Sequence, residues 1–353
     1  MINWPPKLLK SLSRKNTIIF FGAGVAAEFG IPSWGGFVDK LVESVSFDDK
    51  LADDEINQYR SSERYLDTLE VIYRADEQQF HETMRAEFLA DSFPDFENKT
   101  NQELLFDLGQ PIYLTTNVDN SIEEARKNGS LKRSTEILSY TNTKSIRDKL
   151  LNTDLNKNPL VVSVHGQLSD PQNLIFTRSQ YSNIFLGKNT FFFEKILPAL
   201  FLTHTVLMVG YSLNDPDLQM VLEKLATNKP YSHNIYLLLN KSISKYAMTD
   251  FENRLDLQVV NISNSKHHEN PSLELNYALQ RLQEIVNKIT DDPNQYTDNA
   301  SISKLAAEVQ QNLTKKNHES SDDDSRSCAV IESEEIIGIA EKVMNNQEGN
   351  TEP

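Results

Sequence analysis

The chain has 353 residues, a hydrophobic fraction of 39% and a formal net charge of −16. This length allows one large domain with additions or two modest domains, and the apolar residues suffice for a core, so wholesale disorder is excluded. The acidic balance argues against a broad nucleic-acid-binding face, because neutralising phosphates requires clustered lysine and arginine side chains.

The single cysteine, Cys328, lies in a polar stretch near the C-terminal end. One cysteine cannot form a disulfide within the chain or build a cysteine-rich zinc site, so we expect neither a disulfide framework nor a zinc module. Residues 1–10 lack an apolar run of signal-peptide length, and the longest apolar stretch, around residues 202–213, is too short to span a bilayer. These features favour a soluble cytoplasmic protein with no membrane partner.

Six short apolar runs, rich in β-branched and aromatic residues, lack the alternation of a half-exposed strand. Such runs are typical of parallel strands that are buried on both faces. Helical patterns lie between the runs, and this order predicts βαβ units in a Rossmann-like, doubly wound α/β sheet. The predicted strands are Thr17–Phe21, Ile112–Thr115, Leu160–Val164, Val206–Val209, Ile235–Leu239 and Leu257–Ile262.

The segment from about residue 36 to residue 107 contains no convincing strand, and its apolar residues follow helical spacing, as in Phe80, Met84 and Phe88. It is too long for an ordinary crossover, so we predict an inserted all-helical subdomain after the first strand. A second helical insertion is expected at about residues 179–200.

Composition becomes more polar and acidic after about residue 290. We therefore expect a catalytic domain over residues 1–290 and an acidic, mostly flexible tail with short helical segments over residues 291–353. One interpretation of the tail is a solvated segment. The other is an element for docking a partner or for self-assembly.

The first candidate site is Gly22-Ala23-Gly24, which follows a predicted strand and opens a predicted helix. Glycines at such a turn let the backbone approach a pyrophosphate, and a helix N-terminus offers amide donors. The usual third glycine of the dinucleotide fingerprint is not at its usual spacing, and no acidic residue ends an obvious second strand, so an ordinary dehydrogenase is disfavoured.

Two more candidates follow the next predicted strands, at their carboxyl ends, where open α/β sheets bind ligands. Asn117 and Asp119 are suited to a ribose and a water, although each could instead be a turn or helix-cap residue. His165 precedes a glycine, and a neutral imidazole there could accept a proton near pH 7. A lone histidine is otherwise more often structural.

The last candidate is the string Gly210-Tyr211-Ser212-Leu213-Asn214, after the predicted strand Val206–Val209. Gly210 and Ser212 would end this strand, and Asn214 would cap the following helix. The capping interpretation accounts for Asn214 without any ligand.

Together these strings resemble the catalytic core of the sirtuin family over about residues 15–285. Gly22-Ala23-Gly24 with Gly30-Ile31-Pro32 is similar to the family's opening motif, and Thr115-Thr116-Asn117-Val118-Asp119 to its Thr-Gln-Asn-X-Asp motif. A His-Gly and a Gly-X-Ser-Leu follow in the family's order. The sequence departs from the pattern at Ala26, where a serine is common, and at Ser33-Trp34-Gly35, where Asp-Phe-Arg is common.

The resemblance implies roles for individual residues. Asn117 and His165 would be catalytic, Asn117 holding the nicotinamide ribose and the attacking water and His165 serving as the general base. NAD⁺ would be the substrate, and no metal is implied. The residues implied to bind NAD⁺ are Gly22, Ala23, Gly24, Ile31, Pro32, Thr116, Asp119, Gly210, Ser212 and Asn214.

The string from Gly210 to Asp217 is most similar to bacterial sirtuin-like proteins that hydrolyse NAD⁺ to nicotinamide and ADP-ribose. This resemblance implies a regulated, NAD⁺-depleting effector of anti-phage defence, acting as a homo-oligomer or with an ATPase or nuclease partner. Two alternatives stay open. One is an NAD⁺-dependent protein deacylase, which the lack of zinc-binding cysteines disfavours. The other is a non-catalytic sensor of NAD⁺ or ADP-ribose.

Overall fold

The computed structural model describes residues 1–45, 50–62, 64–89, 98–127, 129, 131–132, 134–186, 191–211, 222, 234–241, 243–263 and 270–312. The chain divides into two compact units, Met1–Ser303 and Lys304–Pro353. The first unit holds the sheet and the candidate site. The second is described only as far as residue 312, and its described residues are helical.

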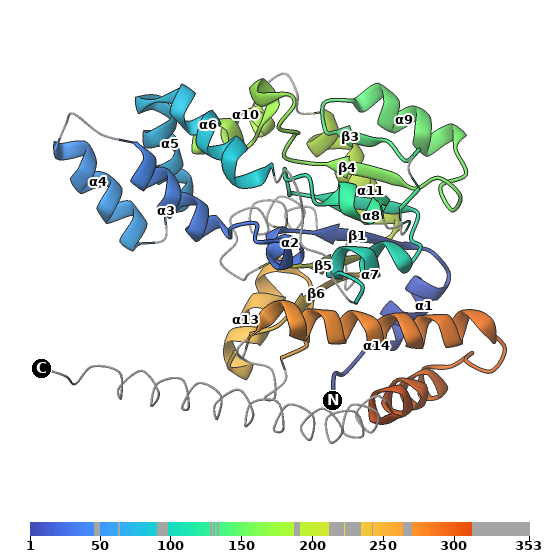
Figure 1. Ribbon diagram of the computed structural model, residues 1–353. Coiled ribbons are helices and arrows are strands. Elements are labelled where there is room, and N and C mark those ends of the chain that lie inside the picture. The colour runs from blue at the N-terminus through green and yellow to red at the C-terminus, as the bar shows by residue number, and fades with distance from the viewer. Residues whose placement is uncertain are drawn as a thin grey trace, which may run out of the picture. The chain divides into compact units, whose positions relative to one another are not determined.

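The core of the first unit is a parallel seven-stranded sheet in the order β3-β4-β2-β1-β5-β6-β7 (Figure 1). This arrangement confirms the predicted Rossmann-like, doubly wound α/β fold. Each predicted strand is present, with ends within one residue of those expected. The strands are β1 Thr17–Phe21, β2 Ile112–Thr115, β3 Ile137–Ser139, β4 Leu160–Ser163, β5 Thr205–Val209, β6 Ile235–Leu239 and β7 Gln258–Asn261.

Strand β3 was not predicted. It has three residues, lies at the edge of the described sheet and pairs with β4. A run this short has no periodicity that distinguishes a strand from a loop.

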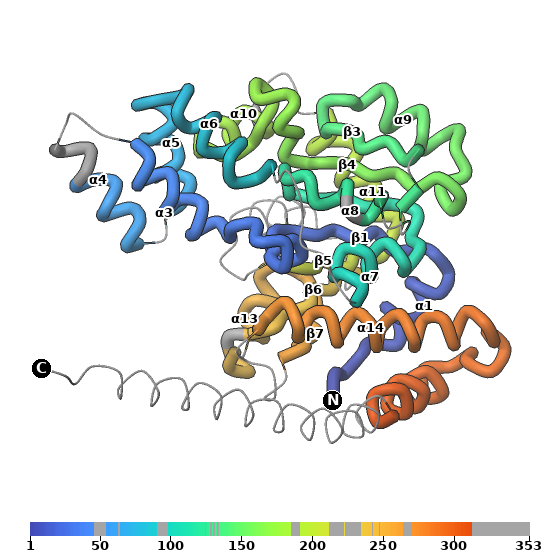
Figure 2. The backbone as a smooth tube through the Cα atoms, in the orientation of Figure 1, coloured from blue at the N-terminus to red at the C-terminus, as the bar shows by residue number. Residues whose placement is uncertain are grey.

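Both faces of the sheet are covered, which explains the continuous apolar runs. Ile18 and Phe20 of β1 point into a core shared with α9, α10, α11 and α13, whereas Phe21 packs edge-on against Phe106 of α7. Figure 2 traces α14 past α1 and α7. The helices outside the insertion are α1 Pro6–Ser13, α2 Ala23–Ala26, α7 Asn101–Asp107, α8 Ile122–Lys127, α9 Thr143–Asn152, α10 Arg178–Leu186, α11 Leu197–Thr203, α13 Lys245–Leu255 and α14 Pro271–Asp291.

The segment after β1 forms a group of helices at the end of β1 to which its arrow points (Figure 1). These helices are α3 Trp34–Ser44, α4 Lys50–Ser61, α5 Tyr65–Ala75 and α6 Glu77–Phe88. Their apolar faces share one core, in which Phe37 of α3 meets Phe88 of α6 with ring centroids 4.8 Å apart. Phe176, from the segment before α10, packs on both rings. The inserted helices therefore pack against the sheet domain close to the carboxyl ends of the strands.

The region of the second predicted insertion contains α10, a π-helix at Phe192–Ile196, and α11. None of the helices in the described part of the chain is both long and apolar enough to cross a membrane. The predicted domain boundary near residue 290 falls at the end of α14, and the boundary itself stays a prediction.

Candidate active site

The glycine turn after β1 packs directly against the end of β5. The amide of Gly22 donates to the carbonyl of Val209 at 2.9 Å, and the amide of Gly24 donates to the carbonyl of Gly210 at 3.0 Å. A Cβ atom on Gly24 would lie 2.9 Å from the Cα of Gly210. The glycines thus permit a close crossing of two backbones at the point where the strand order reverses, where such folds bind ligands.

The crossing uses two amides of the glycine turn. Those of Gly22 and Gly24 bond to the carbonyls of Val209 and Gly210, and the predicted role of these glycines in binding NAD⁺ stays a prediction. Ala23 is the residue of this turn that lines the neighbouring pocket.

The loop after β2 is fixed by its threonine. The hydroxyl of Thr115 donates to the carbonyl of Phe21 at 3.0 Å and accepts from the amide of Asn117 at 3.0 Å. This places the Asn117 side chain in the pocket lining, where its Nδ2 is buried and has no hydrogen-bond partner among the described residues. Because an unpaired buried amide costs about 1–3 kcal/mol, Asn117 is suited to a polar ligand.

Thr116 and Asp119 complete this loop. The hydroxyl of Thr116 lies 3.2 Å from that of Tyr211, whose ring fills the space beside Gly22. The carboxylate of Asp119 accepts from the amide of Ser121 at 2.9 Å, directly before α8. Burial raises the pKa of Asp119 above its ordinary value. The turn interpretation of Asp119 therefore accounts for one of its contacts, while the side chain also borders the pocket.

His165 lies just beyond β4, and Gly166 turns the chain with a φ of 86°. The carbonyl of His165 accepts from the amide of Ile175 at 3.1 Å, and a Cβ on Gly166 would lie 2.4 Å from the carbonyl oxygen of Asn173. The imidazole is 3% exposed, and burial lowers its pKa to about 3. The ring is therefore neutral near pH 7, which leaves one nitrogen able to accept a proton.

A single pocket joins residues from these three strand ends. It encloses about 410 Å³ of space, part of it open to solvent. Its lining residues are Ala23, Ile31, Pro32, Trp34, Phe37, Phe88, Thr116, Asn117, Val118, Asp119, His165 and Phe176.

The structure therefore brings most of the predicted site residues together. Asn117, His165, Thr116, Asp119, Ala23, Ile31 and Pro32 line the pocket, whereas Gly22, Gly24 and Gly210 form the adjoining crossing of β1 and β5. Ser212 and Asn214 lie outside the described residues.

The apolar wall of the pocket was not predicted from sequence. Trp34 and Phe37 come from α3, Phe88 from the end of α6, and Phe176 from the segment before α10. Helical spacing indicated Phe88 as a core residue of the insertion. The same pattern carries no sign that this core opens onto a ligand pocket.

The burial of His165 predicts a specific loss of stability in mild acid. An unfolded histidine titrates near pH 6.5, whereas the folded pKa is about 3, so the unfolded chain binds the extra proton between these values. Stability from this residue is fully present above pH 6.5 and falls as the pH drops toward 3. Lowering the pH from 7.5 to 5.5 should therefore cost about 1.4 kcal/mol through His165.

This effect can be measured as the difference in urea unfolding free energy between pH 7.5 and 5.5, for the wild type and for His165→Gln. The variant is the control because Glu28 also titrates in this pH range in both proteins. Burial raises the pKa of Glu28 to about 7, so its protonation in the folded state favours folding at pH 5.5 and opposes the effect of His165. An equal pH dependence in the two proteins would show that folding does not exclude a proton from His165.

No group of three or more histidine, cysteine, aspartate or glutamate side chains in the described part of the chain could hold a metal ion. A parallel sheet with a glycine crossing and a pocket at its strand ends defines a Rossmann-like ligand-binding protein. Residues 111–260 match the family model described as a SIR2-like domain. This match confirms the resemblance to the sirtuin-like family that the sequence motifs indicated.

Individual relatives are similar at modest identity. The chain is 26% identical over 262 residues to a protein named NAD(+) hydrolase ThsA from Enterococcus faecium, covering 73% of this chain and 50% of that protein. It is 23% identical to the protein of the same name from Bacillus cereus, covering 80% and 56%, respectively. Defense-associated sirtuin 2 from Bacillus subtilis is 24% identical, covering 64% and 21%. The chain thus spans about half the length of the ThsA proteins.

A solved structure from work on the mechanism and regulation of Sir2 enzymes aligns with a TM-score of 0.40 at 13% identity. That alignment covers 81% of this chain and 98% of the solved one.

Proposed function

We propose that this protein hydrolyses NAD⁺ at the bond between nicotinamide and ribose, giving nicotinamide and ADP-ribose. The observation that carries the proposal is the pairing, in one pocket, of the unpartnered Asn117 amide with the neutral His165 imidazole. The names of the ThsA relatives, NAD(+) hydrolase, support the same activity.

Breaking the bond needs little help from the protein, because the nicotinamide ring is cationic while it is bonded to the ribose and is released as a neutral molecule. The protein must orient the ribose, stabilise an oxocarbenium-like sugar and supply water. The Nδ2 of Asn117 would donate to the ribose, and its Oδ1 would hold the attacking water. His165 would accept a proton from a ribose hydroxyl or from this water.

The rest of the molecule would be bound by shape and polarity. The aromatic wall of Trp34, Phe37 and Phe176 would cover the reacting end and exclude bulk water, apart from the nucleophile. Ala23 would face the pyrophosphate, and Gly210 would border the adenosine side together with Ser212 and Asn214. The glycine crossing beside this placement leaves no room for a larger residue, because a Cβ atom on Gly24 or Gly210 would lie between the two backbones.

We further propose a cytoplasmic role in anti-phage defence. One relative is named Defense-associated sirtuin 2, which supports a role in defence. A free NAD⁺ hydrolase would harm its own cell, so the activity would be held latent until infection. Homo-oligomerisation, or an ATPase or nuclease partner, would supply this control. The acidic C-terminal segment is the candidate element for assembly.

The activity is tested by incubating the full chain with NAD⁺ and separating nicotinamide and ADP-ribose by chromatography. We expect the two products in equal amounts, without any added acyl-peptide, at a protein concentration or with a partner that releases the latent activity. Release of nicotinamide only in the presence of acyl-lysine peptide would instead indicate a deacylase. Binding of NAD⁺ without cleavage, at every protein concentration and with candidate partners added, would indicate a sensor.

A further inference from the structure

The aromatic wall of the pocket joins two parts of the molecule that are far apart in sequence. Trp34, Phe37 and Phe88 come from the inserted helices, whereas Phe176 comes from the sheet domain, between β4 and α10. The ring centroid of Phe176 lies 5.3 Å from that of Trp34 and 5.8 Å from that of Phe37. The wall therefore crosses a junction, and whether it is closed depends on what holds Phe176 against the inserted helices.

The backbone of Phe176 is fixed by the first turn of α10. The side chain of Gln180 accepts from the amide of Phe176 at 2.8 Å and from the amide of Thr177 at 3.0 Å. The hydroxyl of Thr177 in turn accepts from the amide of Gln180 at 3.4 Å, which completes the capping box encoded by Thr177-Arg178-Ser179-Gln180. A movement of this turn therefore moves Phe176 with it.

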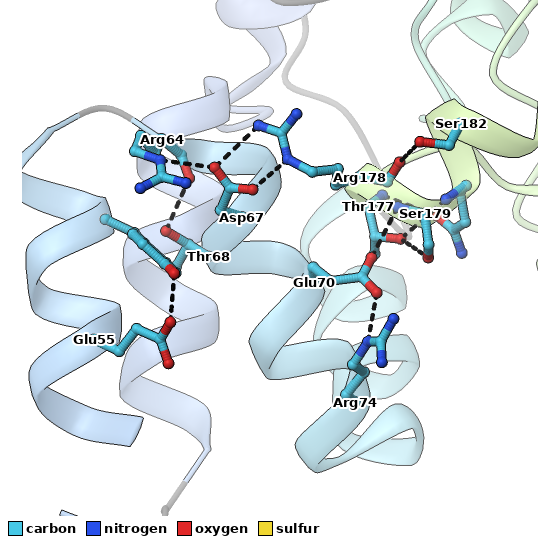
Figure 3. Close-up of polar contacts among 12 residues, drawn as sticks. Glu55, Arg64, Asp67, Thr68, Glu70, Arg74, Thr177, Arg178, Ser179 and Ser182 are labelled. Carbon is cyan, nitrogen blue, oxygen red and sulfur yellow. Dashed lines mark hydrogen bonds and ion pairs between the residues drawn. The ribbon is translucent and has the colours of Figure 1, made fainter. Parts of the chain in front are cut away.

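Helix α5 of the insertion holds this turn through two carboxylates (Figure 3). Asp67 forms a two-contact ion pair with Arg178, one contact being 3.0 Å between Nη2 and Oδ2. One turn further along α5, the carboxylate of Glu70 accepts from the amide of Ser179 at 2.9 Å. We call these contacts of Asp67 and Glu70 with Arg178 and Ser179 the latch, because they join the insertion to the sheet domain directly after Phe176.

Both carboxylates of the latch are charged at neutral pH. Burial opposes ionisation of Asp67, yet the bonds from Arg178 and Arg64 hold its pKa below the ordinary value. Burial also opposes ionisation of Glu70, yet its bonds, that from Ser179 foremost, lower its pKa to about 2. Ion pairs of this kind add little net stability, but a guanidinium fork with two contacts allows few orientations of its partner. The latch is therefore better suited to fixing the position of α10 than to raising overall stability.

We propose that Asp67 and Glu70 are positioning residues, which hold Phe176 against Trp34 through the first turn of α10 and so keep the pocket closed over the nicotinamide end of its ligand. Breaking the latch would let this turn move away from α3 and open the aromatic side of the pocket to solvent. The consequence for catalysis rests on the proposed hydrolase function, whereas the position of Phe176 does not.

The closed wall can be observed without any substrate, because Phe176 packs on one of the two tryptophans in the chain. The other is Trp4, which lies before α1 and whose Nε1 has no hydrogen-bond partner among the described residues. Trp4→Phe therefore removes no such bond and leaves Trp34 as the sole indole fluorophore. Acrylamide quenching of its fluorescence then measures how far solvent reaches the wall.

In this background, Asp67→Asn combined with Glu70→Gln should raise the quenching constant of Trp34 about twofold, because local opening exposes the indole. Asp39→Asn is the matched control, since it loses an exposed ion pair with Arg60 that lies wholly inside the insertion. This control should leave the quenching constant unchanged. An unchanged constant in the double variant as well would overturn the proposal.

A mutant cycle shows whether the two carboxylates act through Phe176. Phe176→Leu alone should also raise quenching, and adding it to the double variant should raise quenching no further, because both changes remove the same contact. Additive increases would mean that Trp34 is exposed by another route, and would overturn the proposal. Urea unfolding verifies that each protein is folded in the assay. Should the double variant not fold, Arg178→Lys replaces it in the cycle, because it keeps the charge and loses the fork.

The effect on the ligand is measured by steady-state kinetics of nicotinamide release. The double variant should raise KM for NAD⁺ about tenfold and change kcat by less than about threefold, because binding must now close the wall and bound NAD⁺ restores it. An unaltered KM together with raised quenching would show that the closed wall does not serve the ligand. If the wild type cleaves no NAD⁺ under any condition, the hydrolase function fails, and the quenching of Trp34 still decides whether the latch holds the wall.

Discussion

Replacing His165 with alanine is expected to lower the rate of nicotinamide release by about 10²- to 10⁴-fold, the usual contribution of a positioned general base. Asn117→Ala should lower it by about 10²-fold, because the ribose and the water lose their orientation. Both side chains line the pocket, and neither change adds bulk, so NAD⁺ should still bind. The rates are read from product chromatography, and binding is read by calorimetry.

Two matched substitutions control this experiment. His204 precedes β5 at the opposite end of the strand from the pocket, and Asn152 ends α9 on the surface. His204→Ala and Asn152→Ala should retain the wild-type rate. If His165→Ala hydrolysed NAD⁺ as fast as these controls, the histidine would have no part in the chemistry.

The second large effect is expected for Gly210→Ala, which should lower the free energy of unfolding by roughly 2–4 kcal/mol and weaken NAD⁺ binding. Gly210 has a φ of 76°, and its added Cβ would lie 2.8 Å from the amide nitrogen of Val25. Relief of this overlap requires β5 and the glycine turn to move apart. Urea unfolding measures the first effect, and calorimetry with NAD⁺ measures the second.

Gly129 provides the matched control for this prediction. Its φ is 86°, and a Cβ there would meet no atom of the described residues within 4 Å. Gly129→Ala should therefore cost only the backbone strain, about 1 kcal/mol, and leave NAD⁺ binding unchanged. Equal losses in the two variants would mean that the close crossing of β1 and β5 contributes nothing beyond backbone strain.

The sheet could be predicted from sequence because burial on both faces leaves a simple pattern. Runs such as Ile235–Leu239 have no polar residue to interrupt them, and turn residues bound them. Strand β3 was not predicted because it is a three-residue strand at the sheet edge. Such a strand needs only one side chain in the core, which is too few to give a pattern in the sequence. Leu138 supplies it, and the flanking residues resemble those of a loop.

The polar part of the site was also accessible to sequence reasoning. Asn117 and His165 each follow a recognisable strand, and the carboxyl ends of parallel strands must meet at one edge of the sheet. Their assembly in one pocket follows from topology. Their catalytic roles stay predictions until the variants are measured.

What sequence reasoning missed depends on contacts between distant segments. Phe88 was marked by helical spacing only as a core residue of the insertion, and in the structure it packs on Phe176 in the pocket wall. Tyr181 meets His165 from α10, a helix whose first turn is bonded to Glu70 of α5. The amides of Gly22 and Gly24 bond to the carbonyls of Val209 and Gly210, a use that no local pattern encodes.

The central claim is that NAD⁺ binds with its nicotinamide ribose at Asn117 and His165, and a crystal structure of His165→Ala soaked with NAD⁺ tests it most directly. In that crystal we expect intact NAD⁺ with its pyrophosphate beside Ala23 and a ribose hydroxyl within hydrogen-bonding distance of the Asn117 Nδ2, whose donor is unpaired among the described residues. NAD⁺ bound elsewhere, or bound with its adenine in place of the nicotinamide ribose, would contradict it.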